Sequence, residues 1–218
     1  MTANTVTNNF LLPAITAVLN GAFPSSTVLP QNNCGLVSPI LKKGDPQDPA
    51  NYRPICVTNP LVRQYARILN TRLVGYLERL HIRSPTQSGF RPGLPTTHQL
   101  LAFQHLLSTS RSAKHSVYAC FLDLKGAYDR VDREMLWVAL HRIAVNGLFL
   151  QASRSLYSSS SVVVNICGQS GPSLPSQTGL RQGCPYSPTL FGLMSNGLDR
   201  ELRTEFQHHG TYFDATGS

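Results

Sequence analysis

The N-terminal part of the sequence lacks charge, since residues 1–41 contain no Asp, Glu, Lys or Arg. A secretory signal would place a basic residue before its apolar core, and none is present there. Pro13 and Asn20 interrupt the apolar stretches, so no run reaches the roughly 18 residues that a membrane span requires. We therefore expect residues 10–20 to form a helix that packs against other parts of the protein, with Gly21 ending it.

Closely spaced cysteines are also lacking. The chain has 5 cysteines, no two of which form a Cys-x-x-Cys pair, and their number is odd. The histidines show no metal-ligand spacing, and the adjacent His208 and His209 indicate a solvated end. These features argue against a disulfide framework and against a zinc site. We expect reduced intracellular thiols, most of them buried, at Cys34, Cys56, Cys120, Cys167 and Cys184.

Acidic residues are scarce. The sequence has 11 Asp and Glu against 19 Lys and Arg, which gives a formal net charge of +8 and a pI near 9.5. A basic surplus of this size favours an anionic partner, and nucleic acid is the first candidate. Charge alone does not decide the matter, because basic proteins of many kinds exist.

The chain is nevertheless apolar enough to form a core. Its 218 residues are 41% hydrophobic, and this length suits one large domain or part of a larger one. Apolar positions three or four residues apart predict helices at 60–80, 132–146, 148–157 and 187–206, and one that Thr96 or Thr97 caps. Extended runs predict strands at 36–41, 52–57, 117–123 and 161–167, with a return strand from Leu174. This order predicts an α+β fold in which helices pack on an antiparallel sheet.

Asp123 is the most informative single residue. It ends the apolar run 117–123, so a buried strand would hold its carboxylate at an exposed tip, where it could bind a divalent cation. On the local sequence alone, a role in capping the next turn is about equally plausible. For Asp129, six residues later, a place in a turn near Asp132 is the better interpretation.

The sequence blocks around Asp123 are more specific than any single residue. Phe121–Val131 resembles motif A of the reverse transcriptases of non-LTR (LINE-like) retrotransposons, and Gly179–Pro188 is similar to motif B of that family. Gln87–Gly93, followed by Thr96–Leu100, is similar to motif 2. Upstream, two further segments resemble the fingers region, and the Arg-Gln-Gly-Cys-Pro form of motif B favours the LINE-like branch. These fingers segments are Pro39–Asp45 and Asn51–Ile55.

The resemblance implies roles for individual residues around a nucleotide. Asp123, with the backbone carbonyl of Leu124, would hold the catalytic metals, and two Mg²⁺ ions are expected in the complete family enzyme. Tyr128 would lie under the sugar of the incoming nucleotide and disfavour a 2′-hydroxyl. Gln182 and Gly183 would line the nucleotide pocket. The expected partners are an RNA template, a DNA primer and deoxynucleoside triphosphates.

The basic residues are expected to bind phosphate or to brace the fold. Lys42 and Arg53 would contact the triphosphate, because guanidinium and ammonium groups are good donors to phosphate oxygens. The adjacent Lys43 is a rival for the role of Lys42. We expect Arg91 to brace the fingers or to touch the template. The resemblance also implies an intracellular location, with the nucleus as one option.

One element of the family pattern is missing from the sequence. Motif C, which contributes a pair of acids, does not appear after motif B, and Tyr212–Ala215 lacks that pair. We therefore expect this polypeptide alone to have little or no polymerase activity and to leave an open sheet edge. The expected organisation is an uncharged helical segment at 1–35, a fingers-like region at 36–112, a partial palm at 113–206 and a tail at 207–218.

Two alternatives to an active polymerase stay open from the sequence. One is a non-catalytic remnant that binds nucleic acid through its basic residues. The other is an inert product of a decayed element.

Overall fold

The computed structural model describes residues 3–25 and 33–205. Their strands form a four-stranded sheet in the order β2-β1-β3-β4. β1 pairs antiparallel with β2, β3 pairs antiparallel with β4, and β1 runs parallel to β3. The strands are β1 (Cys34–Leu41), β2 (Tyr52–Thr58), β3 (Ser161–Ile166) and β4 (Gln169–Pro175).

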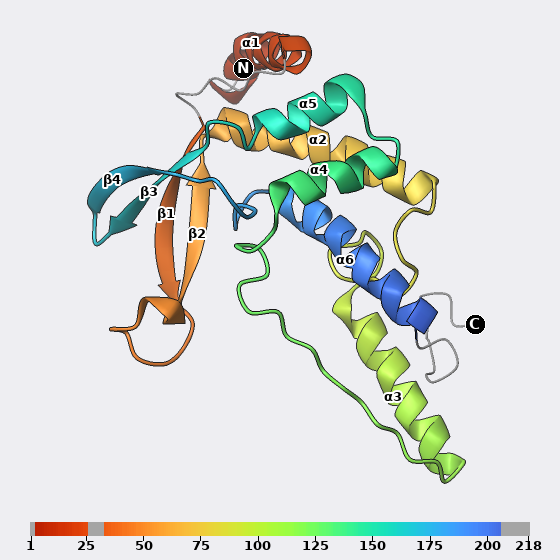
Figure 1. Cartoon of the computed structure of the whole chain (residues 1–218). Helices are drawn as coiled ribbons and strands as arrows, with labels where there is room; N and C mark the ends of the chain where they lie inside the picture. Colours follow the sequence, from red (N-terminus) through yellow and green to blue (C-terminus); the bar gives the residue numbers. More distant parts are fainter. Residues whose placement is uncertain (1–2, 26–32, 206–218) are drawn as a thin grey trace.

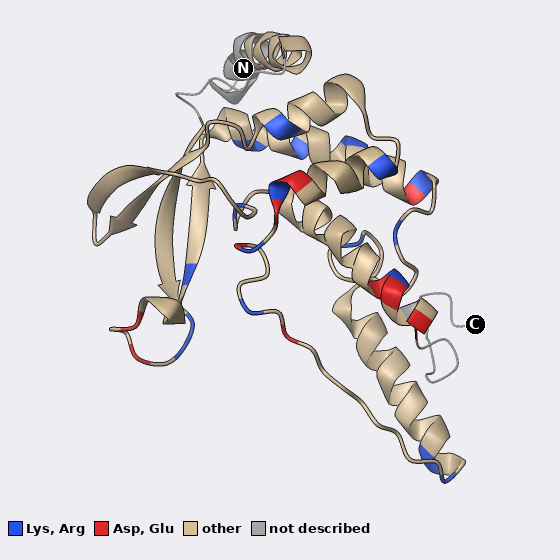
Figure 2. Ribbon diagram, viewed as in Figure 1, with Lys and Arg blue, Asp and Glu red and all other residues tan. Residues whose placement is uncertain are grey.

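The α+β class is confirmed, but the sheet is mixed rather than antiparallel throughout. Parallel neighbours need a long crossover connection, and the chain between β2 and β3 supplies one that contains helices. β1 and β2 belong to the expected fingers-like region and β3 and β4 to the expected palm, so the sheet joins the two. Within the sheet the only charged side chain is Arg53, and Figure 2 shows charges gathered instead at the loop that connects β1 and β2.

Most of the helices pack together beside this sheet, whereas the helix Thr96–Ser112 projects away from them and contains no buried residue (Figure 1). Asn59 accepts a hydrogen bond from the backbone N–H of Leu61 at 2.9 Å and so caps α2, which begins at Pro60. Asp132 caps α4 in the same way through the N–H groups of Glu134 and Met135. The helices are α1 (Ala3–Ser25), α2 (Pro60–Arg79), α3 (Thr96–Ser112), α4 (Arg133–Arg142), α5 (Gly147–Ser155) and α6 (Ser187–Glu205), with a short 3-10 helix at Pro49–Asn51.

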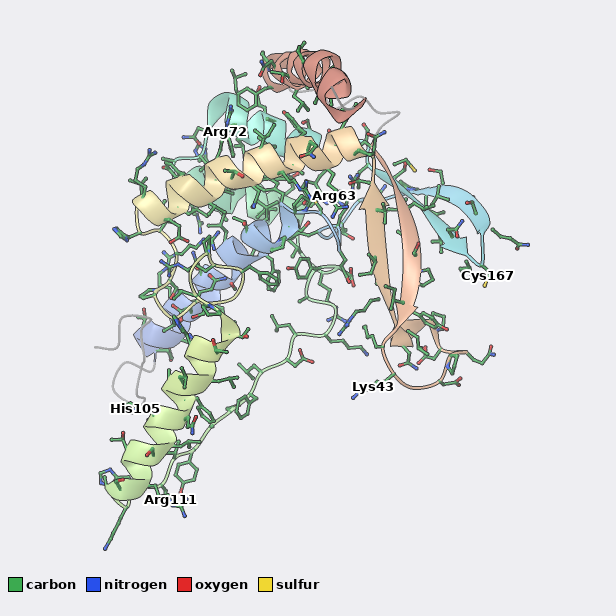
Figure 3. The ribbon with its side chains drawn as sticks, turned by 180° about the vertical axis from the view of Figure 1, so that it is seen from behind. Lys43, Arg63, Arg72, His105, Arg111 and Cys167 are labelled. Atoms are coloured by element: carbon green, nitrogen blue, oxygen red, sulfur yellow. The ribbon has the colours of Figure 1, made fainter. Side chains whose placement is uncertain are left out.

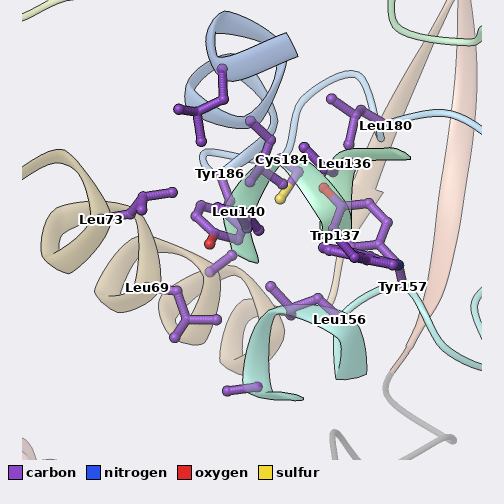
Figure 4. Close-up of a cluster of buried hydrophobic side chains, with 14 of the residues drawn as sticks. Leu69, Leu73, Leu136, Trp137, Leu140, Leu156, Tyr157, Leu180, Cys184 and Tyr186 are labelled. Atoms are coloured by element: carbon purple, nitrogen blue, oxygen red, sulfur yellow. The ribbon is translucent and has the colours of Figure 1, made fainter. Parts of the chain in front are cut away.

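The hydrophobic core lies where α2, α4, α5 and α6 meet (Figure 4). Leu69 and Leu73 of α2 and Leu140 of α4 are at most 1% exposed. Tyr186, just before α6, is fully buried, and its hydroxyl lies 2.9 Å from that of Ser153 in α5. Burial raises the pKa of Tyr186. The core therefore fixes the start of α6 relative to the other helices.

Three local predictions about helices need correction. α1 does not end at Gly21 but continues to Ser25, because a single glycine weakens a helix by only about 1 kcal/mol. Thr96 is the first residue of α3 rather than its cap, and Pro95 before it makes no capping side-chain bond. The helix after Asp132 ends at Arg142, and Asn146 instead precedes α5.

Residues 115–124 contradict the prediction of a buried strand at 117–123. They have no regular secondary structure and pair with no strand of the described ranges. Tyr118 is 95% exposed and Phe121 is 83% exposed, although the Phe121 ring meets Phe103 of α3 edge-on. A strand is stable only when a neighbour satisfies its backbone hydrogen bonds, so an apolar run is not sufficient. Figure 1 shows the segment running from the far end of α3 back to α4.

The cysteines are free thiols, but the expectation that most of them are buried is wrong. Cys56 and Cys184 are buried, and burial raises the pKa of the Cys56 thiol. Cys120 lies in the exposed segment 115–124, and Cys167 is exposed at the end of the β3–β4 hairpin (Figure 3). None of the described helices is long and apolar enough to cross a membrane. The expected tail at 207–218, with His208 and His209, lies outside the described residues.

Candidate functional site

A cleft of about 1180 Å³ lies between the β1–β2 hairpin, residues 123–129, β3 and Gln182. All the residues predicted to surround a nucleotide line it, apart from Gly183. Segments as far apart in the chain as residues 37 and 182 thus form one concave surface. The predicted residues that line it are Lys42, Arg53, Asp123, Leu124, Tyr128 and Gln182.

The hairpin supplies positive charge to the cleft. The backbone N–H of Lys42 donates to the carbonyl of Asn51 at 2.8 Å, which closes the loop between the strands. Lys42 and Arg53 line the cleft and form no ion pair within the described ranges. Lys43, the rival for the role of Lys42, is not among the lining residues and lies at the tip of the hairpin (Figure 3).

Asp123 lines the cleft but does not stand at the tip of a strand. It belongs to the exposed segment 115–124 and has no hydrogen-bond or ion-pair partner among the described residues. The expected proximity of Asp123 to Tyr128 and Gln182 is observed, while the expected support by a strand is not. Its carboxylate is free to bind a cation or a donor that enters the cleft.

Tyr128 forms a rigid part of the cleft wall. Its ring stacks on Phe191 of α6, with centroids 5.0 Å apart and an angle of 14° between the planes. Gly126, at φ +63°, turns the chain before it, and its carbonyl accepts the N–H of Asp129 at 3.0 Å. Burial raises the pKa of the Tyr128 hydroxyl, so the ring stays neutral at physiological pH.

The loop from Thr178 to Cys184 is hydrogen-bonded to both walls of the cleft. Leu180 donates its N–H to the carbonyl of Tyr128 at 2.8 Å, and the carbonyl of Gln182 accepts the N–H of Cys56 at 2.7 Å. Gly183, at φ +104°, packs so closely that a Cβ would lie 2.7 Å from the Cys56 oxygen. Only glycine, which has no side chain, therefore fits at this position beside the cleft.

Two arginines hold this loop in place, the partly buried Arg133 and the buried Arg181, and no local sequence pattern predicted their roles. Arg133 donates to the carbonyls of Gly179 at 2.9 Å and Ser176 at 2.6 Å, and burial lowers its pKa. Arg181 donates to both the backbone carbonyl and the side-chain oxygen of Asn33, at 2.9 and 2.8 Å. A charged residue near a helix start or a turn is usually solvated, so no local pattern marks such contacts.

The contacts of Arg91 agree with the expected bracing role, while contact with the template stays a prediction. Its guanidinium pairs with Glu78 of α2 at 2.9 Å and donates to the carbonyl of Ser84 at 3.3 Å. Arg83 reaches the same carboxylate at 3.4 Å. These contacts tie the chain after α2 to that helix.

The cleft contains two further charged residues that had not been assigned a role there. Lys125 adds a third cation, which forms no ion pair with any described residue, and Asp129 adds a second carboxylate. Gln182 donates its side-chain amide to both oxygens of Asp129, at 3.1 and 3.4 Å. Sequence reasoning could have found both residues, because they follow Asp123 closely in the chain.

The residues of the cleft fit part of a magnesium site. Mg²⁺ usually binds one or two carboxylates together with water and substrate phosphates. Asp123 is exposed in the cleft and offers one such carboxylate beside the exposed residue Leu124, whereas Asp129 is engaged by Gln182. The described ranges contain no group of three or more Cys, His, Asp or Glu side chains that could hold a metal by themselves.

Comparison with known proteins agrees with the motifs in the cleft. Residues 40–216 match the family described as reverse transcriptase (RNA-dependent DNA polymerase). A Pol polyprotein from a type-1 retrotransposable element R2 of Popillia japonica is 30% identical over 160 residues, which are 73% of this chain and 22% of the relative. A 149 kDa protein of transposon TX1 from Xenopus laevis is 29% identical over 182 residues, which are 83% of this chain and 14% of the relative.

A third relative covers less of the chain. It is a probable RNA-directed DNA polymerase from transposon X-element of Drosophila melanogaster, 33% identical over 118 residues, or 54% of this chain and 13% of the relative. The chain therefore spans between 13% and 22% of the length of these three relatives. The chain belongs to the reverse transcriptase family, within the branch of non-LTR retrotransposons.

Proposed function

We propose that this chain forms the nucleotide-binding part of an RNA-directed DNA polymerase, which adds deoxynucleotides to a DNA primer on an RNA template. The observation that carries this proposal is the shared cleft, in which Lys42, Arg53, Asp123, Tyr128 and Gln182 lie together. In the reaction, the primer 3′-oxygen bonds to the α-phosphorus, the bond to the β-phosphate oxygen breaks, and pyrophosphate and the hydroxyl proton leave.

The cationic side chains bind the triphosphate in this proposal. Lys42 and Arg53 stand on the hairpin and form no ion pair among the described residues, and Lys125 lines the same cleft. Because a triphosphate carries several negative charges, three unpaired cations favour its binding and orient its phosphates. Gln182 and Gly183 complete the pocket beside β2.

The reaction follows a two-metal mechanism, with Asp123 and the Leu124 carbonyl as ligands from this part of the chain. These residues would hold magnesium, which would stabilise the negative charge that develops on the phosphate. Asp123 is the only carboxylate of the cleft without a partner among the described residues. Residues 1–218 on their own therefore support little polymerisation. Residues 36–112 act as fingers and 113–206 as part of the palm.

Tyr128 selects the sugar of the incoming nucleotide. Its ring cannot retreat from a bulkier sugar, because Phe191 supports it from behind at a centroid distance of 5.0 Å. An added 2′-hydroxyl would therefore meet the ring, whereas a deoxyribose fits. The side chain acts by its shape, and its hydroxyl is not needed for the selection.

The proposal is tested with the complete retrotransposon protein on an RNA template with a DNA primer. The wild-type protein should extend the primer with deoxynucleotides and discriminate against ribonucleotides. Tyr128→Val should weaken this discrimination by roughly 10–200-fold, the usual range for one group in a pocket. Tyr128→Phe is the matched control, since it keeps the ring, and should discriminate as the wild type does.

Two outcomes would count against the proposal. Failure of the wild-type protein to extend any primer, combined with tight, salt-sensitive RNA binding, would favour a non-catalytic nucleic-acid-binding remnant. The net charge of +8 is the observation that keeps this alternative in view. Unchanged sugar discrimination in Tyr128→Val would show that Tyr128 does not contact the sugar of the nucleotide.

A further inference from the structure

Asp129 makes a side-chain contact that belongs to no assigned role in the cleft. Its carboxylate oxygens lie 3.1 and 3.4 Å from the side-chain nitrogen of Gln182. The two residues are 53 positions apart and come from different walls. We propose that Asp129 is a positioning residue that turns the Gln182 amide so that its carbonyl oxygen, and not its NH₂ group, faces the nucleotide. This inference rests on the proposed function of the cleft.

The chemistry of the two groups determines the orientation. An ionised carboxylate only accepts hydrogen bonds, while a glutamine amide has one donating and one accepting end. The NH₂ end of Gln182 must therefore face Asp129. The carbonyl oxygen is then left to accept a hydrogen bond from a donor group of the substrate, such as a sugar hydroxyl or a base amino group.

The backbone of Asp129 is held firmly enough for this task. Its N–H donates to the carbonyl of Gly126 at 3.0 Å. Before it in the chain, the carbonyl of Tyr128 accepts the N–H of Leu180 at 2.8 Å, and after it the carbonyl of Val131 accepts the N–H of Gly179 at 3.0 Å. Hydrogen bonds to the loop thus flank Asp129 on both sides, and its carboxylate approaches Gln182 from a fixed base.

The backbone of Gln182 is fixed independently, from the opposite side. Its carbonyl accepts the N–H of Cys56 in β2 at 2.7 Å, and the next residue, Gly183, packs against the Cys56 oxygen. With both backbones held, the rotation of the Gln182 side chain is the main remaining freedom. The contact with Asp129 removes that freedom.

Direct binding of the substrate by Asp129 does not fit the charge of the cleft. The expected ligand carries several phosphates, and a carboxylate in contact with them would repel them. Because the oxygens of Asp129 accept the Gln182 amide, the residue influences the nucleotide through its neighbour. Its removal should therefore affect nucleotide binding far more than the chemical step.

The test is a double-mutant cycle in the complete protein, with single-nucleotide extension on an RNA template as the readout. Asp129→Ala and Gln182→Ala should each raise KM for the deoxynucleotide about tenfold, the effect expected for one hydrogen bond with a charged partner, while kcat changes less than about threefold. The double variant should show no further increase over Gln182→Ala, because Asp129 then has nothing to orient. Thermal unfolding of the variants should stay close to that of the wild type.

A matched control is Glu134→Ala, which removes another exposed carboxylate close by in the sequence and should leave KM unchanged. Additive effects of the Asp129 and Gln182 substitutions on KM would overturn the inference, as would a change confined to kcat. A wild-type protein that does not extend the primer would instead reject the proposed function. The two failures are thus distinguishable.

Discussion

Replacing Asp123 with asparagine should lower kcat for RNA-templated DNA synthesis by about 10²–10³-fold, the range seen when one group that stabilises charge in a transition state is lost. The two side chains are nearly equal in size, so the cleft keeps its shape and loses only a negative charge. Asp123 is exposed and lines the cleft without a partner among the described residues, which leaves its charge available to a cation.

This prediction is measured by single-nucleotide extension with the complete protein over a range of magnesium concentrations. The substitution should also raise the magnesium concentration needed for half-maximal rate, since a ligand is lost. Glu201→Gln is a suitable control, because it removes an exposed carboxylate on α6 outside the cleft. Activity of Asp123→Asn within a few fold of the wild type would exclude a direct role for this carboxylate.

The Gly179→Ala substitution should destabilise the protein by about 3 kcal/mol or more. At φ +75° an alanine loses roughly 1–2 kcal/mol through its own backbone strain. Its Cβ would also lie 2.8 Å from the backbone carbonyl oxygen of Asp129 and 2.9 Å from that of Tyr128. Displacement of such packed atoms costs about 1–3 kcal/mol more. The displaced backbone carries Tyr128 and Asp129, so nucleotide binding should weaken as well.

Gly168→Ala separates the two causes in this prediction. Gly168 has a similar φ of +81°, but nothing lies within 4 Å of the position of its Cβ. The free energy of unfolding, measured with urea, should therefore fall by only about 1–2 kcal/mol in this variant. If Gly168→Ala and Gly179→Ala lowered the free energy of unfolding equally, the close packing of Gly179 on the backbone of Tyr128 and Asp129 would contribute nothing to stability.

Local signals in the sequence were sufficient for most helices and for the first hairpin. Asn59 with Pro60, and Asp132 alone, set helix starts through contacts within three residues, so their effect does not depend on the rest of the fold. Residues 36–41 and 52–57 form the paired strands β1 and β2, because a short polar turn between two apolar runs favours a hairpin.

The prediction that failed most clearly was the strand at 117–123, and its failure has a physical cause. Pairing depends on a partner strand, which no local pattern reveals, and none of the described strands pairs with this segment. The same segment still brings Asp123 into the cleft, because the turn at Gly126 and the stacking of Tyr128 on Phe191 anchor its end. The motif therefore located the site although the predicted support for it was wrong.

Long-range polar contacts were beyond prediction from the sequence. Arg133, Arg181 and Asp129 act on residues that are more than 40 positions away. Each looks like an ordinary surface charge until the fold brings its partner close. The parallel pairing of β1 with β3 is of the same kind, since it depends on how the helices between them pack.

The most direct test of the account is a structure of the complete protein with an RNA template, a DNA primer, magnesium and an incoming deoxynucleotide. The account predicts a triphosphate between Lys42 and Arg53, a sugar resting on Tyr128, and an α-phosphate that shares its metal with Asp123. A nucleotide bound at another surface, with Asp123 remote from its phosphates, would contradict it.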